Sequence, residues 1–155
     1  MKKQGSIEVL ARGVCVKAGR LLVCHTLGAA NTYLPGGHVE FLESAPQSLV
    51  REIAEEMGLK ARAGRFLGAV EHSFVQRGER HCEVNLVFAV AIVGVNRGSA
   101  PPSREKHIEF LWLPLKSLAE SNLEPAVLRA LLPKWLRHRS STERWGSTCE
   151  RRCGS

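Results

Sequence analysis

Short runs of apolar residues, many of them alternating with polar ones, predict six β-strands along the chain. These runs cover residues 7–16, 21–24, 33–34, 66–76, 82–93 and 108–113. Turns are expected at residues 18–19 and 77–79. In the run 82–93, the positions next to Val84, Leu86 and Phe88 are also mostly apolar. Burial on both faces explains such a pattern, so we expect that strand near the centre of a sheet.

Between the third and fourth runs, the apolar period lengthens to that of an α-helix. Ser44 is expected to be its N-cap, with Gln47 three positions later completing a capping box. The helix should extend to Met57 and end at Gly58. At about 100° per residue, a single arc facing the core holds Leu49, Val50, Ile53 and Met57.

Two more helices are expected after the last strand. The first is short, at residues 115–119, and the second opens at Glu124-Pro125. The second has an apolar stripe of helical period: Leu128, Leu131, Leu132, Trp135 and Leu136. Packing against the sheet is the favoured explanation for this stripe, with a homodimer contact as the alternative. The order of the elements suits a mixed sheet with helices on both sides.

The end of the chain differs in composition from the rest. Residues 138–155 are polar and rich in Arg, without any periodicity. We therefore predict one domain over residues 1–137 and a disordered basic tail over residues 138–155.

An acidic cluster shares the first helix with its apolar arc. Glu52, Glu55 and Glu56 are spaced i, i+3 and i+4, which places them on one side of the helix. Their mutual repulsion is offset only in part by Arg51, four residues before Glu55. A hard divalent cation such as Mg²⁺ would remove the repulsion, because it prefers oxygen ligands. A solvated acidic face is the alternative.

Composition narrows the class of protein. The 155 residues suit one domain, and no apolar run approaches the roughly 20 residues of a membrane span. Five scattered cysteines and the absence of a signal sequence favour a cytoplasmic protein with reduced thiols. A net charge of +7 favours phosphate-rich ligands. We predict no specific DNA binding, because the basic residues do not alternate with aromatic ones.

The glycine turn and the acidic helix together form a longer pattern. Gly37 is followed after five residues by Glu43, and after seven more by residues 51–59, REIAEEMGL. This pattern resembles the signature box of the Nudix hydrolases at every fixed position. The resemblance implies an α/β fold of the α+β type, an α/β/α sandwich with a mixed central sheet.

The resemblance also implies a reaction and a set of roles. Members hydrolyse a nucleoside diphosphate linked to another group, with Mg²⁺ or Mn²⁺ as cofactor. Glu55 and Glu56 would be the principal metal ligands, and Glu52 a further ligand or the base. The carbonyl of Gly36 would be another ligand, and Arg51 would hold the carboxylates in place with Glu43.

Residues near the box are further candidates. Family members often recruit one more Glu from outside it, and Glu83, Glu105 and Glu109 are the candidates here, with Glu83 ranked first. Gly37 and His38 are candidates for substrate binding, although for His38 a turn histidine satisfied by backbone contacts is the favoured interpretation. Leu42 departs from the family, in which Gly often precedes the first box Glu.

The substrate follows mainly by elimination. Residues 73–77 lack the Pro typical of ADP-ribose hydrolases and the Tyr typical of dinucleoside polyphosphate hydrolases. A nucleoside triphosphate or a small nucleotide derivative is therefore the default substrate. The alternatives are a non-catalytic nucleotide-sensing module and an RNA 5′-end pyrophosphohydrolase that uses the basic tail.

Overall fold

A computed structural model describes residues 5–96, 98–138 and 143–149 of the chain. The strands are β1 (Ile7–Val14), β2 (Val16–Lys17), β3 (Arg20–Thr26), β4 (Thr32–Tyr33), β5 (Gly36–His38), β6 (Ala61–Gln76), β7 (Glu79–Ile92), β8 (Ile108–Pro114) and β9 (Trp145–Ser147). The helices are α1 (Ala45–Met57), the 3₁₀ helix η1 (Leu115–Glu120) and α2 (Leu128–Arg137). None of these helices is long and apolar enough to span a membrane.

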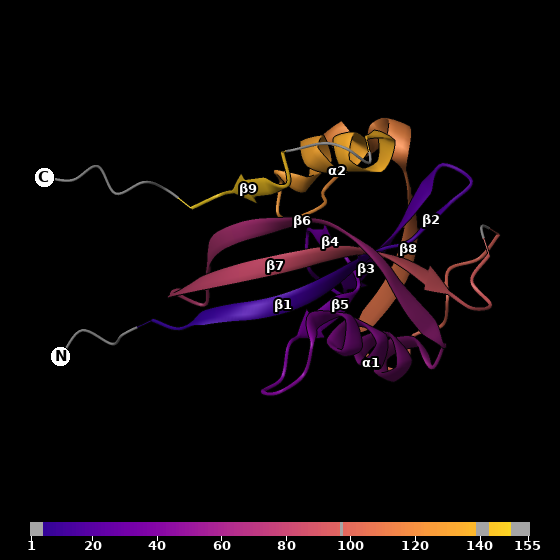
Figure 1. Ribbon diagram of the computed structural model, residues 1–155, viewed down its shortest axis with the longest axis horizontal. Coiled ribbons are helices and arrows are strands. Elements are labelled where there is room, and N and C mark those ends of the chain that lie inside the picture. The colour runs from indigo at the N-terminus through magenta and orange to yellow at the C-terminus, as the bar shows by residue number, and fades with distance from the viewer. Residues whose placement is uncertain (1–4, 97, 139–142, 150–155) are drawn as a thin grey trace, which may run out of the picture.

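Two sheets and two helices form a layered structure. The larger sheet has the strand order β5-β1-β7-β6-β9, in which the β1–β7 and β6–β9 pairs are parallel. The smaller sheet contains β2, β3 and β4, with β8 paired to β3. Helices α1 and α2 lie on opposite sides of the larger sheet (Figure 1). The predicted sandwich with a mixed central sheet is thus confirmed.

Two apolar clusters hold these layers together. One cluster joins α2 and η1 to the sheets and contains Trp135, Leu132 and Leu67, all fully buried. The other joins α1 to β1, β3 and β7 and contains Leu49 and Ile53, also fully buried. The apolar stripe of α2 is buried within its own chain, as expected if the stripe packs against the sheet.

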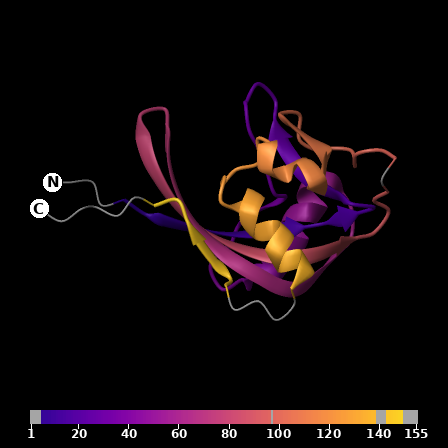
Figure 2. The same ribbon diagram turned by 90° about the horizontal axis from the view of Figure 1, so that it is seen from above.

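Strand β7 lies between β1 and β6, as its apolar pattern predicted. Strand β6 begins at Ala61, five residues before the predicted start at residue 66. Ala61 and Ala63 pair with β7, although small residues have low strand propensity. Figure 2 shows the β6–β7 hairpin extending from the body, with β9 running beside β6.

The ends of α1 are those that the sequence predicts. The Ser44 side chain accepts a hydrogen bond from the Gln47 backbone N–H, and the Gln47 side chain accepts one from the Ser44 N–H. Gly58 ends the helix in the left-handed conformation. These local interactions fix the two ends of the helix, and hence which of its acidic residues face β5.

The start of α2 differs from the prediction. The helix begins at Leu128, and the Glu124-Pro125 pair lies in a turn ahead of it rather than in its first turn. The Glu124 carboxylate accepts hydrogen bonds from the Ala126 N–H at 2.9 Å and from Arg129 Nη2 at 3.0 Å. These contacts hold residues 124–127 in the turn, so Glu124 is placed beside the helix end instead of inside it.

The prediction of disorder for the tail is wrong for residues 143–149. Strand β9 extends the larger sheet by pairing in parallel with β6, and Gly146 is buried in that pairing. The Trp135 indole N–H donates to the Glu143 carbonyl at 2.7 Å, and Arg144 Nη1 donates to the Leu67 carbonyl at 2.8 Å. A segment without periodicity is thus ordered by contacts with distant residues. Residues 139–142 and 150–155 of the predicted tail lie outside the described chain.

The departure from the family pattern at Leu42 has a local cost. Leu42 has φ 64°, a left-handed conformation that is unfavourable for residues with a side chain. Its side chain is 91% exposed. Replacing Leu42 with Gly should therefore raise the free energy of unfolding by about 1 kcal/mol, because strain is relieved and no packing is lost. Thermal melts would measure the gain. Phe41→Gly is the control, since Phe41 is equally exposed but has no positive φ; an equal gain there would contradict the explanation.

Candidate metal and nucleotide site

Arg51 connects the acidic residues of α1 to the loop that precedes it. Its Nε and Nη2 donate to the two carboxylate oxygens of Glu43 at 2.8 and 3.0 Å. Its Nη1 donates to Glu52 at 2.9 Å and to Glu55 at 3.3 Å. The hydrogen bonds from Arg51 lower the pKa of Glu43 to about 2. Arg51 therefore holds Glu43 ionised and fixes the position of Glu52.

The glycine turn brings backbone directly against the acidic cluster. A Cβ on Gly37 would collide with the carboxylate of Glu52, and a Cβ on Gly36 would collide with the Ala11 carbonyl. Gly36 also has φ 131°, a backbone conformation that is unfavourable for any residue with a side chain. The absence of side chains at this turn is therefore what lets Glu52 lie against β5.

Glu56 is the most perturbed acid of the cluster. Its side chain is buried, and its Oε2 has no hydrogen-bond partner within the described chain. Burial, and next the negative charge of Glu52, raise its pKa to about 8. A buried carboxylate oxygen without a partner needs either a proton or a cation beside it.

The residues present fit a divalent cation. No three carboxylate, imidazole or thiol groups of the described chain surround a common point, and Arg51 holds Glu52 and Glu55. The unpartnered oxygen of Glu56 and the cradle that Gly37 leaves for Glu52 nevertheless supply the oxygen ligands that Mg²⁺ prefers. The Gly36 carbonyl accepts one hydrogen bond, from Arg12 at 3.1 Å, and keeps a second lone pair.

The raised pKa of Glu56 predicts a pH-dependent stability in metal-free protein. The folded pKa of about 8 lies above the reference value of 4.5. The contribution of protonated Glu56 is therefore fully present below about pH 4.5 and is lost as the pH rises towards about 8. At pH 8 in chelator, Glu56→Gln should exceed the wild type in unfolding free energy by about 2–4 kcal/mol, and by much less at pH 5. Denaturant unfolding at both pH values measures this; parallel pH curves would contradict it.

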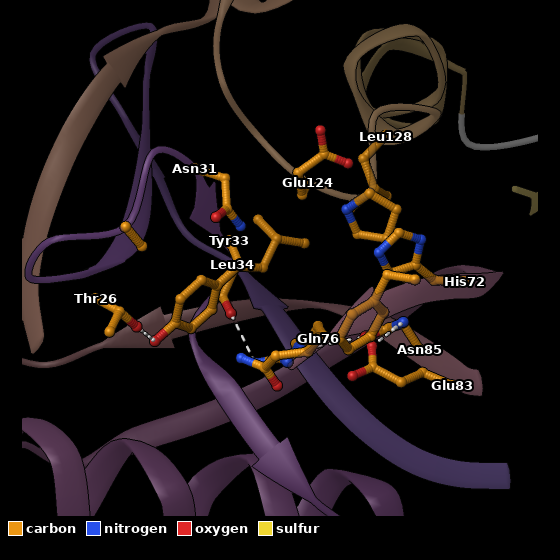
Figure 3. A pocket seen from close by; sticks show the side chains of 14 residues that line it. Thr26, Asn31, Tyr33, Leu34, His72, Gln76, Glu83, Asn85, Glu124 and Leu128 are labelled. Atoms are coloured by element: carbon orange, nitrogen blue, oxygen red, sulfur yellow. Dashed lines mark hydrogen bonds between the residues drawn. The ribbon is translucent and has the colours of Figure 1, made fainter. Parts of the chain in front are cut away.

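A pocket of about 550 Å³ lies beside the cluster, between the β6–β7 hairpin, the loop after β3 and the start of α2. Its volume suits a nucleotide-sized ligand. Figure 3 shows Asn31 and Tyr33 on one side and His72, Glu83 and Asn85 on the other. Apolar side chains of Leu34, Phe74 and Leu128 complete much of the wall. The pocket thus combines apolar surface with several polar groups.

Arg12 connects the pocket to the metal candidates. It lines the pocket, donates to the Leu34 and Gly36 carbonyls at 3.1 Å each, and donates to Asn85 Oδ1 at 3.3 Å. Its guanidinium also lies 5.4 Å from the centre of the Tyr33 ring. Sequence reasoning missed Arg12 and Asn85. The available signal was a polar residue interrupting a run of otherwise apolar strand positions.

The structure separates the three acids outside the box. Glu83 lines the pocket and accepts a hydrogen bond from Asn85 Nδ2 at 3.3 Å. Glu105 lies close enough to Glu56 to contribute to its raised pKa. Glu109 pairs with His25 at 2.8 Å on the smaller sheet and does not line the pocket. Glu105 therefore lies near the helix acids, Glu83 lies at the pocket wall, and Glu109 is at neither place.

His38 lies at the surface beside the glycine turn. Its ring Nε2 is 3.0 Å from Glu8 Oε2, so a carboxylate rather than the backbone satisfies the ring. Its carbonyl accepts hydrogen bonds from Ser48 at 2.9 Å and Arg51 at 3.1 Å. Neither Gly37 nor His38 lines the pocket. The backbone of this turn therefore positions the helix, while the His38 ring faces away towards β1.

Comparison with known proteins gives one family. The family model described as NUDIX domain matches residues 8–136. Mutator protein MutT4 of Mycobacterium tuberculosis is 31% identical over 85 residues, which are 55% of this chain and 33% of the relative. The chain thus spans about a third of the length of that relative.

Two solved structures have the same fold. MutT protein from Methanosarcina mazei matches with a TM-score of 0.68 and 21% identity over 89% of this chain and 99% of the other. A MutT NUDIX hydrolase from Burkholderia pseudomallei matches with a TM-score of 0.56 and 27% identity, over 72% of this chain and 85% of the other.

Proposed function

Because the chain belongs to the Nudix family, we propose that it is a hydrolase of diphosphate bonds, acting with Mg²⁺ or Mn²⁺ on a nucleoside diphosphate linked to another group. The observation that supports this most strongly is the buried, unpartnered Glu56 oxygen in a cluster with Glu52. A binding protein without catalytic metal chemistry has no need for such a group. The enzyme would be cytoplasmic, and a homodimer remains part of the proposal.

The residues of α1 and β5 would hold the metal. Glu55, Glu56 and Glu52, with the Gly36 carbonyl, would be its ligands, and Arg51 would shift away from Glu52 and Glu55 while keeping Glu43. The ion, when bound, neutralises phosphate oxygens and activates water. The protein then has to bind the nucleotide, orient the water and accept its proton.

The pocket would bind the nucleoside part of the substrate. Phe74 and Leu128 supply apolar surface for the base, and Arg12 supplies positive charge between the pocket and the acidic cluster. Glu83 at the pocket wall is our first candidate for the base that accepts the proton of the water, with Glu52 and Glu105 as alternatives. Gly37 and His38 would contact the phosphates through the glycine turn.

A nucleoside triphosphate or a small nucleotide derivative is the proposed substrate. The pocket suits one nucleoside, since 550 Å³ lies within the range of about 300–1,000 Å³ for small-molecule sites. The RNA 5′-end alternative depends on the basic tail, and Arg144 of that tail donates a hydrogen bond to the Leu67 carbonyl. We therefore rank it below the small substrates.

A substrate panel tests the proposal. Purified protein is incubated with Mg²⁺ or Mn²⁺ and nucleoside triphosphates, oxidised triphosphates, ADP-ribose, dinucleoside polyphosphates or capped RNA, and the products are separated by chromatography. We expect cleavage at the diphosphate of one small class of substrate. Thermal stabilisation by a nucleotide without any cleavage would instead establish the nucleotide-sensing alternative.

A further inference from the structure

The C-terminal segment reaches the wall of the pocket through Thr148. Strand β9 pairs with β6 so that Ser147 lies opposite Glu71, and the next N–H, that of Thr148, donates to the Glu71 carbonyl at 3.0 Å. This pairing places the Thr148 hydroxyl 2.8 Å from Nδ1 of His72, which lines the pocket. A residue 76 positions away thus contacts a pocket side chain directly.

The hydrogen bonds around Thr148 favour one form of the His72 ring. Thr148 Oγ1 accepts a hydrogen bond from the Ser73 backbone N–H at 3.2 Å. Within the described chain, His72 Nδ1 is the acceptor that remains within reach of the hydroxyl proton. Donation from the hydroxyl makes Nδ1 an acceptor, so the proton of a neutral ring is then on Nε2.

Other contacts keep the ring neutral and in place. The Phe74 ring stacks on it with 5.1 Å between centroids and 23° between planes. Burial lowers the pKa of His72. Its Nε2 has no hydrogen-bond partner among the described residues, so that N–H is available to a ligand in the pocket (Figure 3).

We propose that strand β9, through Thr148, orients His72 so that its Nε2–H donates a hydrogen bond to an acceptor on the nucleobase, making His72 a specificity-determining residue. Thr148 is then a positioning residue. The inference rests on the proposed function for the identity of the ligand, a nucleotide whose base presents a carbonyl oxygen or unprotonated ring nitrogen. It adds that the end of the chain takes part in base selection.

The first test is the tautomer of His72 in the full-length protein. Long-range ¹H–¹⁵N correlation spectra distinguish Nε2–H from Nδ1–H. We expect Nε2–H in the wild type and in Thr148→Ser, which keeps the hydroxyl, and a mixture of tautomers in the near-isosteric Thr148→Val. A wild-type ring protonated on Nδ1, or spectra identical in the Val variant, would overturn the inference.

The second test is discrimination among bases. The four ribonucleoside triphosphates are compared by calorimetric Kd in metal-free protein, and by kcat/KM with Mg²⁺ where they are hydrolysed. Thr148→Val should reduce the spread between the best and the worst base by about 5- to 10-fold, the effect of losing one hydrogen bond, while Thr148→Ser preserves it. An equal loss for all four bases, or no binding of any, would contradict the inference. Binding with base discrimination but without hydrolysis would refute only the proposed function.

Discussion

Replacing Glu55 with Gln should lower kcat by about 10²- to 10³-fold or more while leaving the fold intact, because one ligand of the proposed metal site is lost. The Glu55 side chain is 56% exposed and its contact in the folded chain is a 3.3 Å ion pair with Arg51. An exposed pair of this kind contributes little to stability. Steady-state kinetics and a thermal melt of the same sample would separate the two effects.

Glu40→Gln is the matched control for that experiment. Glu40 is 70% exposed and lies 3.9 Å from Arg51, but it precedes the helix. We expect nearly wild-type kcat from this variant. Turnover of Glu55→Gln close to the wild type, with an unchanged melting temperature, would show that Glu55 is not a ligand of the catalytic metal.

Replacing Trp135 with Ala should have the largest effect on stability. The Trp135 side chain is fully buried in the cluster under α2, and its indole N–H donates to the Glu143 carbonyl. Removal leaves a cavity and an unpaired carbonyl, so we expect a loss of about 3–5 kcal/mol in unfolding free energy. For a chain of this size, that corresponds to a fall of about 6–20 °C in Tm.

Trp145 offers a control of the same residue type. Its side chain is 52% exposed, although it lies in β9 itself. Trp145→Ala should therefore cost less than about 1 kcal/mol. Equal losses from the two variants, measured by denaturant unfolding, would contradict the assignment of Trp135 as the side chain that joins α2 to the C-terminal segment.

Elements defined by local interactions were predictable from the sequence. The capping box of Ser44 and Gln47 and the Gly58 cap specify α1 within a few residues, and the apolar pattern of 82–93 predicts a central strand. Strand β9 depends instead on pairing with residues about 76 positions earlier, such as Ala69 and Val70. No local pattern in residues 143–149 specifies that pairing, so composition alone indicated disorder.

The candidate site divides in the same way. The acidic residues of α1 and the glycine turn form a fixed spacing that the sequence displays directly. Arg12, Asn85 and His72 are brought to the pocket only by the pairing of β1, β6 and β7. The predicted start of α2 was wrong for a similar reason, because the Glu124–Arg129 ion pair shapes the turn that precedes the helix. Contacts between distant segments determine which residues line the pocket, so the sequence pattern did not predict that lining.

The most direct test of the central claim is the metal dependence of hydrolysis. The best substrate of the panel is incubated with wild-type protein in chelator, and Mg²⁺ is then added in excess. We expect background rates in chelator and full recovery with Mg²⁺, with no recovery in Glu55→Gln. Unchanged hydrolysis in chelator, or full Mg²⁺-dependent activity in Glu55→Gln, would contradict a catalytic metal held by the acidic residues of α1.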